Sequence, residues 1–349
     1  MRAFDLAPAR GSLDQALAFH PTVLYALYVH GLPAPRRRPR TGAQLQPMSE
    51  PAPSLRLTHH FHDRLEVHYG PVELFRYVYR PQTAARESPK PYLHPIRTLA
   101  GNEVTIYRPH DHVWHQGLAM TQAVLSGHNF WGGPSYVRDR GYAQLPNNGR
   151  IEHTAWTNLA CESGRLQLEE ELSWISYEGE PWLAEQRRLE VSDLDPQQGY
   201  WGLGFASTLR NVRREALVFG SPTTEGRELA GYGGLFWRGP RSFLKGKILA
   251  GGGLHGPQVM GQAAPWLAYV GRHDGSAATS TVLFVDQPQS VRYPTKWFVR
   301  DDPYAAVSFA FCFDEELTLE PGATLSLSHR LIFADGEWSR ERIEALLQV

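Results

Sequence analysis

The chain has 349 residues and only two cysteines, Cys161 and Cys312. Two thiols are too few for the disulfide framework of a small secreted scaffold. We therefore interpret the chain as cytoplasmic, with both thiols reduced and buried. Its formal net charge of −1 gives no strong basic field of the kind that attracts nucleic acid, so nucleic acid is not an expected partner.

Long apolar runs are missing as well. The longest run near the start, residues 22–29, is far shorter than the roughly 20 residues that cross a bilayer, so no membrane partner is expected. The sequence also has no GxSxG nucleophile elbow, no HExxH and no CxxC. The glycine-rich stretch at 231–235 lacks the Lys-Ser or Lys-Thr ending of a phosphate-binding loop.

The first part of the chain differs from the rest in composition. Residues 31–53 are rich in proline and arginine and show no apolar periodicity. This composition is typical of a linker or an extended arm. We therefore divide the chain into an N-terminal extension, residues 1–53, and a single domain, residues 54–349.

Beyond residue 54, apolar residues recur at every second position, which is the period of a half-buried strand. Gly, Pro, Asn and Asp separate these runs, and no long helices alternate with them. One helix is expected after Ser339, which can cap it. The sequence therefore predicts an all-β fold, a large antiparallel β-sandwich with a short C-terminal helix. Two of the runs would bury Leu166, Leu168, Leu172 and Trp174, and Leu325, Leu327, Leu331 and Phe333.

Three histidines crowd the stretch YRPHDHVWHQGLAM, residues 107–120. If the strand expected at 103–107 continues, His110 and His112 share one face and Asp111 points the opposite way. A turn at Gly117 can bring His115 beside them. We hypothesise that the three imidazoles open to a cleft and act there as acid/base groups.

Two alternatives stay open for the cluster. The HxH spacing also suits a divalent metal on a β-scaffold, so His110, His112 and His115 are candidate metal ligands. His94, His128 or Glu152 are further candidates for a third ligand. Because the chain has 15 histidines, a purely structural cluster is the other alternative.

Three further segments, residues 127–142, 231–243 and 293–304, combine aromatic side chains with arginine or asparagine beside glycine or proline. Aromatic faces stack on sugar rings, and arginine and asparagine bind hydroxyls and carboxylates. We expect Trp131, Trp237 and Trp297 to share one concavity with the histidines. The expected substrate-binding residues are His94, Arg97, Asn129, Trp131, Trp237, Arg238, Trp297 and Arg300.

Four segments carry a resemblance to a known family: PHDHVWHQGL, NFWGG, GYGGLFWRGPR and YPTKWFVRDDPY. Over residues 89–335 the chain resembles the bacterial PmoA-like family, a domain of unknown function labelled methane oxygenase PmoA. It departs from the family at Gln287, where members often have histidine, and at Trp114. The label implies a membrane subunit, which the lack of a spanning segment contradicts. Residues 317–333 are similar to the closing strands of galactose-mutarotase-type supersandwiches.

The genes found beside members of that family imply carbohydrate catabolism. We therefore expect a protein that binds or acts on a small-molecule carbohydrate, as a sugar lyase, hydrolase or epimerase. One alternative is a metal-dependent oxygenase or isomerase resembling a cupin, although Gln116 stands where a cupin usually has glutamate. The other alternative is a non-catalytic ligand-binding module.

The proposed domain boundary leads to a first prediction. Deleting residues 1–47 should leave a folded domain, because this part of the chain ends in a segment without the apolar period of a core element. Denaturant unfolding of the full and shortened chains provides the measurement. A loss of more than about 2 kcal/mol, large beside the net stability of a domain, would show that the extension packs on the core.

Overall fold

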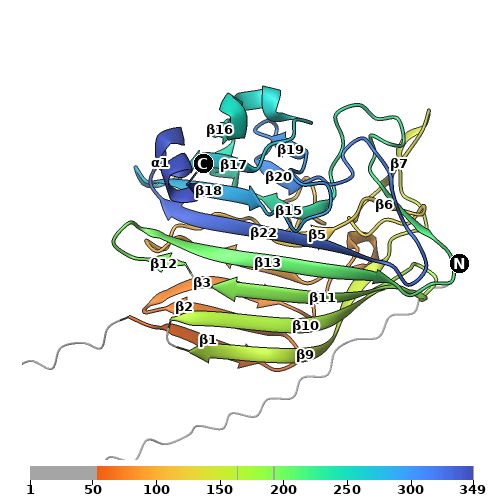
Figure 1. Ribbon diagram of the computed structural model, residues 1–349, viewed down its shortest axis with the longest axis horizontal. Coiled ribbons are helices and arrows are strands. Elements are labelled where there is room, and N and C mark those ends of the chain that lie inside the picture. Colours follow the sequence, from red (N-terminus) through yellow and green to blue (C-terminus); the bar gives the residue numbers. More distant parts are fainter. Residues whose placement is uncertain (1–52, 163, 192, 349) are drawn as a thin grey trace, which may run out of the picture. The chain divides into compact units, whose positions relative to one another are not determined.

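The computed structural model describes residues 53–348 except 163 and 192, and the expected extension lies almost wholly outside this part. Two large antiparallel sheets form the body. Figure 1 shows the strands of one sheet lying over those of the other. The eight-stranded sheet has the order β1 (Leu55–His60), β2 (Arg64–Tyr69), β3 (Val72–Val78), β4 (Tyr92–Ile96), β5 (Leu118–Thr121), β15 (Gly234–Arg238), β20 (Ala306–Phe309) and β19 (Trp297–Arg300).

The second sheet has nine strands, and its long central strands form adjacent pairs in the sheet. Its order is β16 (Lys247–Ala250), β17 (Trp266–Arg272), β18 (Thr279–Asp286), β22 (Thr324–Asp335), β13 (Tyr200–Asn211), β11 (Pro181–Val191), β10 (Arg165–Ile175) and β9 (Arg150–Glu162), with β12 (Leu194–Asp195) beside β13. Smaller sheets join β21 (Leu317–Leu319), β14 (Leu217–Gly220) and β6 (Val124–Leu125), and β7 (Ser135–Val137) with β8 (Gly141–Ala143).

The helical part is small. Ser339 accepts a hydrogen bond from the backbone of Arg342 and caps α1 (Arg340–Leu347), as the sequence predicts. Four single turns of 3₁₀ helix lie at 85–87, 241–243, 251–253 and 256–259. Across the part of the chain that the structure describes, no helix has the length and apolarity needed to cross a membrane. The predicted antiparallel β-sandwich with a short C-terminal helix is confirmed.

The alternating pattern explains the core. The residues expected to be buried on β10 and β22 join one large apolar cluster between the sheets: Leu166, Leu168, Leu172, Trp174, Leu325, Leu327, Leu331 and Phe333. The expected strand at 103–107 is wrong, because Glu103 and Tyr107 form only isolated bridges. The two cysteines are free, but Cys161 is half-buried and not fully buried as expected.

A charged network lies inside this otherwise apolar core. Arg187 donates two hydrogen bonds to the Glu185 carboxylate, and both side chains are fully buried. Arg187 also donates to the hydroxyl of Tyr77, 2.9 Å away on the opposite sheet. The network therefore ties β11 to β3 and satisfies charges that would otherwise be costly to bury.

This network predicts the effect of breaking one ion pair. Arg187→Met should lower the free energy of unfolding by about 3–5 kcal/mol, because Glu185 is left as an unpaired buried charge. Urea unfolding measures the loss. The double variant Arg187→Met with Glu185→Leu should lose less than the sum of the single variants. Strict additivity would contradict the coupling inferred here.

Candidate functional site

The histidine cluster lies in a compact turn between β4 and β5. The backbone N–H of His112 donates to Pro109, and that of His115 donates to His112, with distances of 3.0 and 2.9 Å. Gly117 closes the turn with φ of 59°, and a side chain there would overlap the backbone of Leu93. The extended HxH geometry expected from the sequence is therefore corrected, because the three histidines lie on a turn and not along a strand.

Asp111 is the anchor of the turn. Its Oδ2 accepts hydrogen bonds from Arg238 at 2.9 Å and from His112 Nδ1 at 2.8 Å. Its Oδ1 accepts a third from Arg241 at 3.0 Å. Partial burial alone would raise the pKa of the Asp111 carboxyl, but the hydrogen bonds and the charge of Arg238 hold it well below its ordinary value. The carboxylate is therefore charged at neutral pH and fixed between two guanidinium groups.

Arg238 determines the tautomer of His115. Its NH1 lies 2.8 Å from His115 Nδ1, and a guanidinium can only donate. Nδ1 of His115 must therefore accept, which leaves the proton of the neutral ring on Nε2. Burial, with the neighbouring His112 and Arg238, lowers the pKa of His115 well below its ordinary value. His115 is thus a neutral N–H donor at Nε2.

Asp111 determines the opposite tautomer for His112. A carboxylate can only accept, so His112 Nδ1 carries the proton and Nε2 has a free lone pair. Burial lowers the pKa of His112, Asp111 raises it, and Arg238 and Arg300 lower it further, with a net decrease. The ring is therefore neutral at pH 7, and its Nε2 can accept a proton as a general base does.

The two rings are stacked. The centroids of His112 and His115 are 4.6 Å apart, and the ring planes differ by 16°. Each imidazole binds a metal in its own plane at about 2.0–2.1 Å, so two parallel stacked rings do not coordinate one ion. Within the described residues no group of three His, Cys, Asp or Glu side chains is arranged to hold a metal. The residues present therefore do not fit the metal site considered from the sequence.

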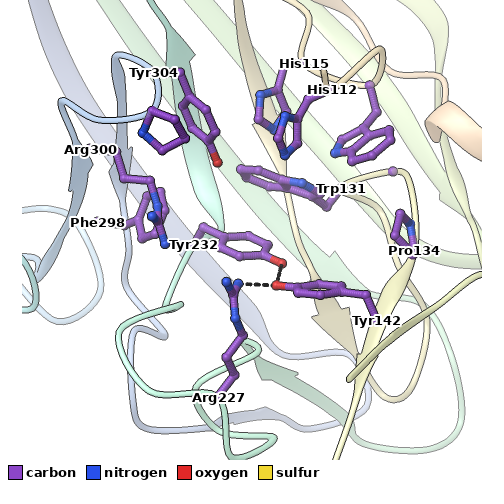
Figure 2. Close-up of a pocket in the computed structure, with 13 residues that line it drawn as sticks. His112, His115, Trp131, Pro134, Tyr142, Arg227, Tyr232, Phe298, Arg300 and Tyr304 are labelled. Carbon is purple, nitrogen blue, oxygen red and sulfur yellow. Dashed lines mark hydrogen bonds between the residues drawn. The ribbon is translucent and has the colours of Figure 1, made fainter. Parts of the chain in front are cut away.

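A cavity of about 400 Å³ opens beside the stacked rings on the outer face of the eight-stranded sheet (Figure 2). Side chains alternate along β15, so Trp237 faces the core and Arg238 and Phe236 face away from it. The residues that line the cavity come from four loop segments and from β8 and β19. The lining comprises His112, Trp114, His115, Trp131, Gly132, Pro134, Tyr142, Arg227, Tyr232, Phe298, Arg300, Pro303 and Tyr304.

Four of the residues expected at the site line this cavity: His112, His115, Trp131 and Arg300. Two other expected residues do not line the cavity but form hydrogen bonds to residues that do. Asn129 Oδ1 accepts from the backbone N–H groups of Trp131 and Gly132 and so shapes their turn. Arg238 is buried and holds Asp111 and His115.

The other expected residues lie elsewhere. His110 is exposed and accepts from Arg241 through Nδ1. His94 contacts Thr105, and Arg97 is paired with Glu73. The shared concavity expected for three tryptophans is corrected, because Trp237 and Trp297 are fully buried in the core. Their indole N–H groups donate to the backbone carbonyls of Val104 and Ala264.

Sequence reasoning missed Tyr304, Tyr232, Tyr142, Arg227 and Phe298. The sequence could have indicated Phe298, because Phe298 and Arg300 are two residues apart on β19 and therefore share a face. Tyr142 on β8 and Arg227 on a loop are 85 positions apart and meet through a hydrogen bond from the guanidinium to the phenol oxygen. No local pattern predicts such a contact.

Fold and site together define an all-β sandwich protein with a cavity on the outer face of one sheet. The chain belongs to a family of unknown function, DUF6807, whose sequence profile matches residues 64–348. This finding corrects the resemblance to the PmoA-like family drawn from the sequence motifs. None of the curated proteins compared with the chain matches it.

The solved structures similar to the chain include two alpha-galactosidases and a galactose 1-epimerase. An alpha-galactosidase from Lactobacillus brevis is 10% identical with a TM-score of 0.38, and the match covers 83% of this chain and 40% of that one. A galactose 1-epimerase from Lactobacillus acidophilus NCFM is 9% identical with a TM-score of 0.36, covering 82% and 99%. An alpha-galactosidase from Geobacillus stearothermophilus is 13% identical with a TM-score of 0.33, covering 82% and 40%. The chain thus spans two fifths of the length of both alpha-galactosidases.

The buried neutral His115 predicts a specific pH dependence of stability. Its pKa is lowered in the folded state, so its contribution to stability is complete above the ordinary histidine value of about 6.5 and decreases as the pH falls below it. His115→Asn should reduce the slope of unfolding free energy against pH by about 1 kcal/mol per unit between about pH 6 and 5. Denaturant unfolding at several pH values measures the slope, with the exposed His255→Asn as the matched control. Equal slopes for His115→Asn and the unmodified protein would contradict the buried neutral state.

Proposed function

We propose that the protein binds a carbohydrate of monosaccharide size in this cavity and that His112 acts on it as the general base. The observation that carries the proposal is the Asp111–His112 pair. The carboxylate holds the Nδ1 proton of His112, so the unprotonated Nε2 belongs to a ring that lines the cavity. A base oriented by a second group is the usual arrangement for proton transfer in an active site.

The walls of the cavity support a sugar as the ligand. Trp131, Trp114 and Tyr304 provide aromatic surfaces, and such faces pack against the apolar faces of sugar rings. A volume of about 400 Å³ lies within the range of small-molecule sites. Hydroxyl groups of Tyr142 and Tyr232, 2.9 Å apart, add polar partners at the wall opposite the imidazoles (Figure 2).

The pair of imidazoles supports a proton-transfer reaction. His112 Nε2 would take a proton from a carbon or hydroxyl of the substrate, and the Nε2–H of His115 would donate a hydrogen bond to the oxygen that gains negative charge. In an epimerisation a proton would be delivered to the opposite face of the same carbon, and in an elimination the proton would pass from His112 to the departing oxygen. A base beside a neutral donor therefore favours a sugar epimerase or lyase.

A glycoside hydrolase is less well supported. Most such enzymes use two carboxyl groups that flank the bond to be cleaved. Among the described residues that line the cavity, none is Asp or Glu. Asp111 does not line the cavity, and its carboxylate already accepts three hydrogen bonds, one of them from His112.

A two-step experiment tests the proposal. Thermal unfolding with a panel of monosaccharides and sugar acids should find a ligand that raises the melting temperature. Proton NMR of that ligand with the protein in D₂O should then show exchange of a carbon-bound proton or loss of water. His112→Asn, whose amide can keep the bond to Asp111, should retain binding and slow the reaction at least about 100-fold.

The exposed His255→Asn is the matched control and should react like the unmodified protein. Binding without any reaction would identify a non-catalytic module and overturn the role of His112. Failure of every sugar to raise the melting temperature would overturn the carbohydrate assignment itself.

A further inference from the structure

Two residues that line the cavity have buried hydrogen-bond donors without a partner among the described residues. Trp114 and His115 are these lining residues, and the buried atoms without a hydrogen-bond partner in that part of the chain are Trp114 Nε1 and His115 Nε2. An indole nitrogen can only donate, and the bond from Arg238 makes His115 Nε2 a donor as well. Buried donors without partners are rare in folded proteins, so a ligand rich in acceptor atoms is the natural complement.

Arg300 adds a charged donor to the same cavity. It extends from β19, and its Nε is buried without a hydrogen-bond partner in the described part of the chain. No ion pair is found for it among those residues, and the flanking Phe298 offers only its ring, 5.4 Å from the guanidinium carbon. The neighbouring Arg238, in contrast, is neutralised by Asp111. A half-buried guanidinium without a counter-ion calls for an anion.

Arg227 increases the positive charge. It contacts the hydroxyl and the ring of Tyr142, and neither contact supplies a negative charge. His112 and His115 are neutral, and no carboxylate lines the described walls. The cavity surface therefore carries two positive side chains and no negative one.

We propose that the substrate is an anionic sugar, in which Arg300 binds a carboxylate or phosphate group while the ring lies against Trp131. The inference rests on the proposed function and specifies its substrate class. The planar guanidinium fork matches two oxygens of either anion, which a neutral hydroxyl does not offer. The N–H groups of Trp114 and His115 would then donate hydrogen bonds to ring or hydroxyl oxygens of the sugar.

The position of Arg300 relative to His112 gives the anion a chemical role. Arg300, His112 and Tyr304 line the same cavity, and the ring centroids of His112 and Tyr304 are 5.0 Å apart, so the base and the cation can contact one small ligand. If the anion is a carboxylate, His112 removes the proton from the adjacent carbon, and the electron pair of that C–H bond moves into the carboxylate held by Arg300. The electron pair then returns to the carbon, which takes up a proton on its opposite face. Alternatively, it expels the hydroxyl of the next carbon, which leaves as water with the proton from His112. No oxidant or co-reactant is required.

Calorimetric titration with charged and neutral sugars tests the inference. The probes are glucose and galactose, their uronic acids, their 6-phosphates, and inorganic phosphate. At least one acidic sugar should bind ten times or more tightly than its neutral parent, and Arg300→Gln should abolish that preference. Arg300→Lys, which keeps the charge and loses the fork, should show an intermediate preference. Arg272→Gln, an exposed change on β17, is the matched control and should keep the full preference.

The outcomes separate the two proposals. A uronic acid or a phosphate that binds best identifies the source of the anion, and both results support the inference. If neutral sugars bind as tightly as their acids and Arg300→Gln has no effect, the inference of an anionic substrate is wrong. The proposal of a carbohydrate site is then still supported. Binding of inorganic phosphate as tight as that of every acidic sugar, uronic acids included, or no binding by any sugar, overturns both.

Discussion

The carboxylate of Asp111 is the group on which the site depends. It neutralises the buried Arg238, bonds Arg241 and fixes the Nδ1 proton of His112. Arg238 in turn fixes the acceptor nitrogen of His115. One carboxylate thereby places a proton acceptor and a proton donor side by side, because arginine can only donate and a carboxylate can only accept.

The sandwich supplies the rigid support that this arrangement requires. Arg238 lies on β15 between β5 and β20, so its position is set by the sheet and not by a mobile loop. The adjacent Trp237 packs into the core and donates to a backbone carbonyl, which fixes the register of the strand. Loops then add Trp131, Tyr304 and Arg227 around a base whose orientation is already determined.

Period-two apolar runs and the Ser339 cap were sufficient to predict the sandwich and its terminal helix, because both signals are local. The site could be predicted only in part. Clustering pointed to His112 and His115, but Trp237 and Trp297 were misplaced because residues were not sorted by strand face. The tautomer of His112 depends on the adjacent Asp111, but that of His115 depends on Arg238, 123 positions away, and no sequence spacing encodes that contact.

The central claim is that His112 and His115 are neutral rings of opposite tautomer, and nitrogen-15 NMR of histidine-labelled protein at neutral pH tests it most directly. The account predicts a protonated Nδ1 and a bare Nε2 for His112, with the reverse for His115. Assignment by the His112→Asn and His115→Asn variants separates the two rings from the other histidines. Protonation of both nitrogens of His112, or a protonated Nδ1 in His115, would contradict the account, because neither state leaves a base and a donor facing the same cavity.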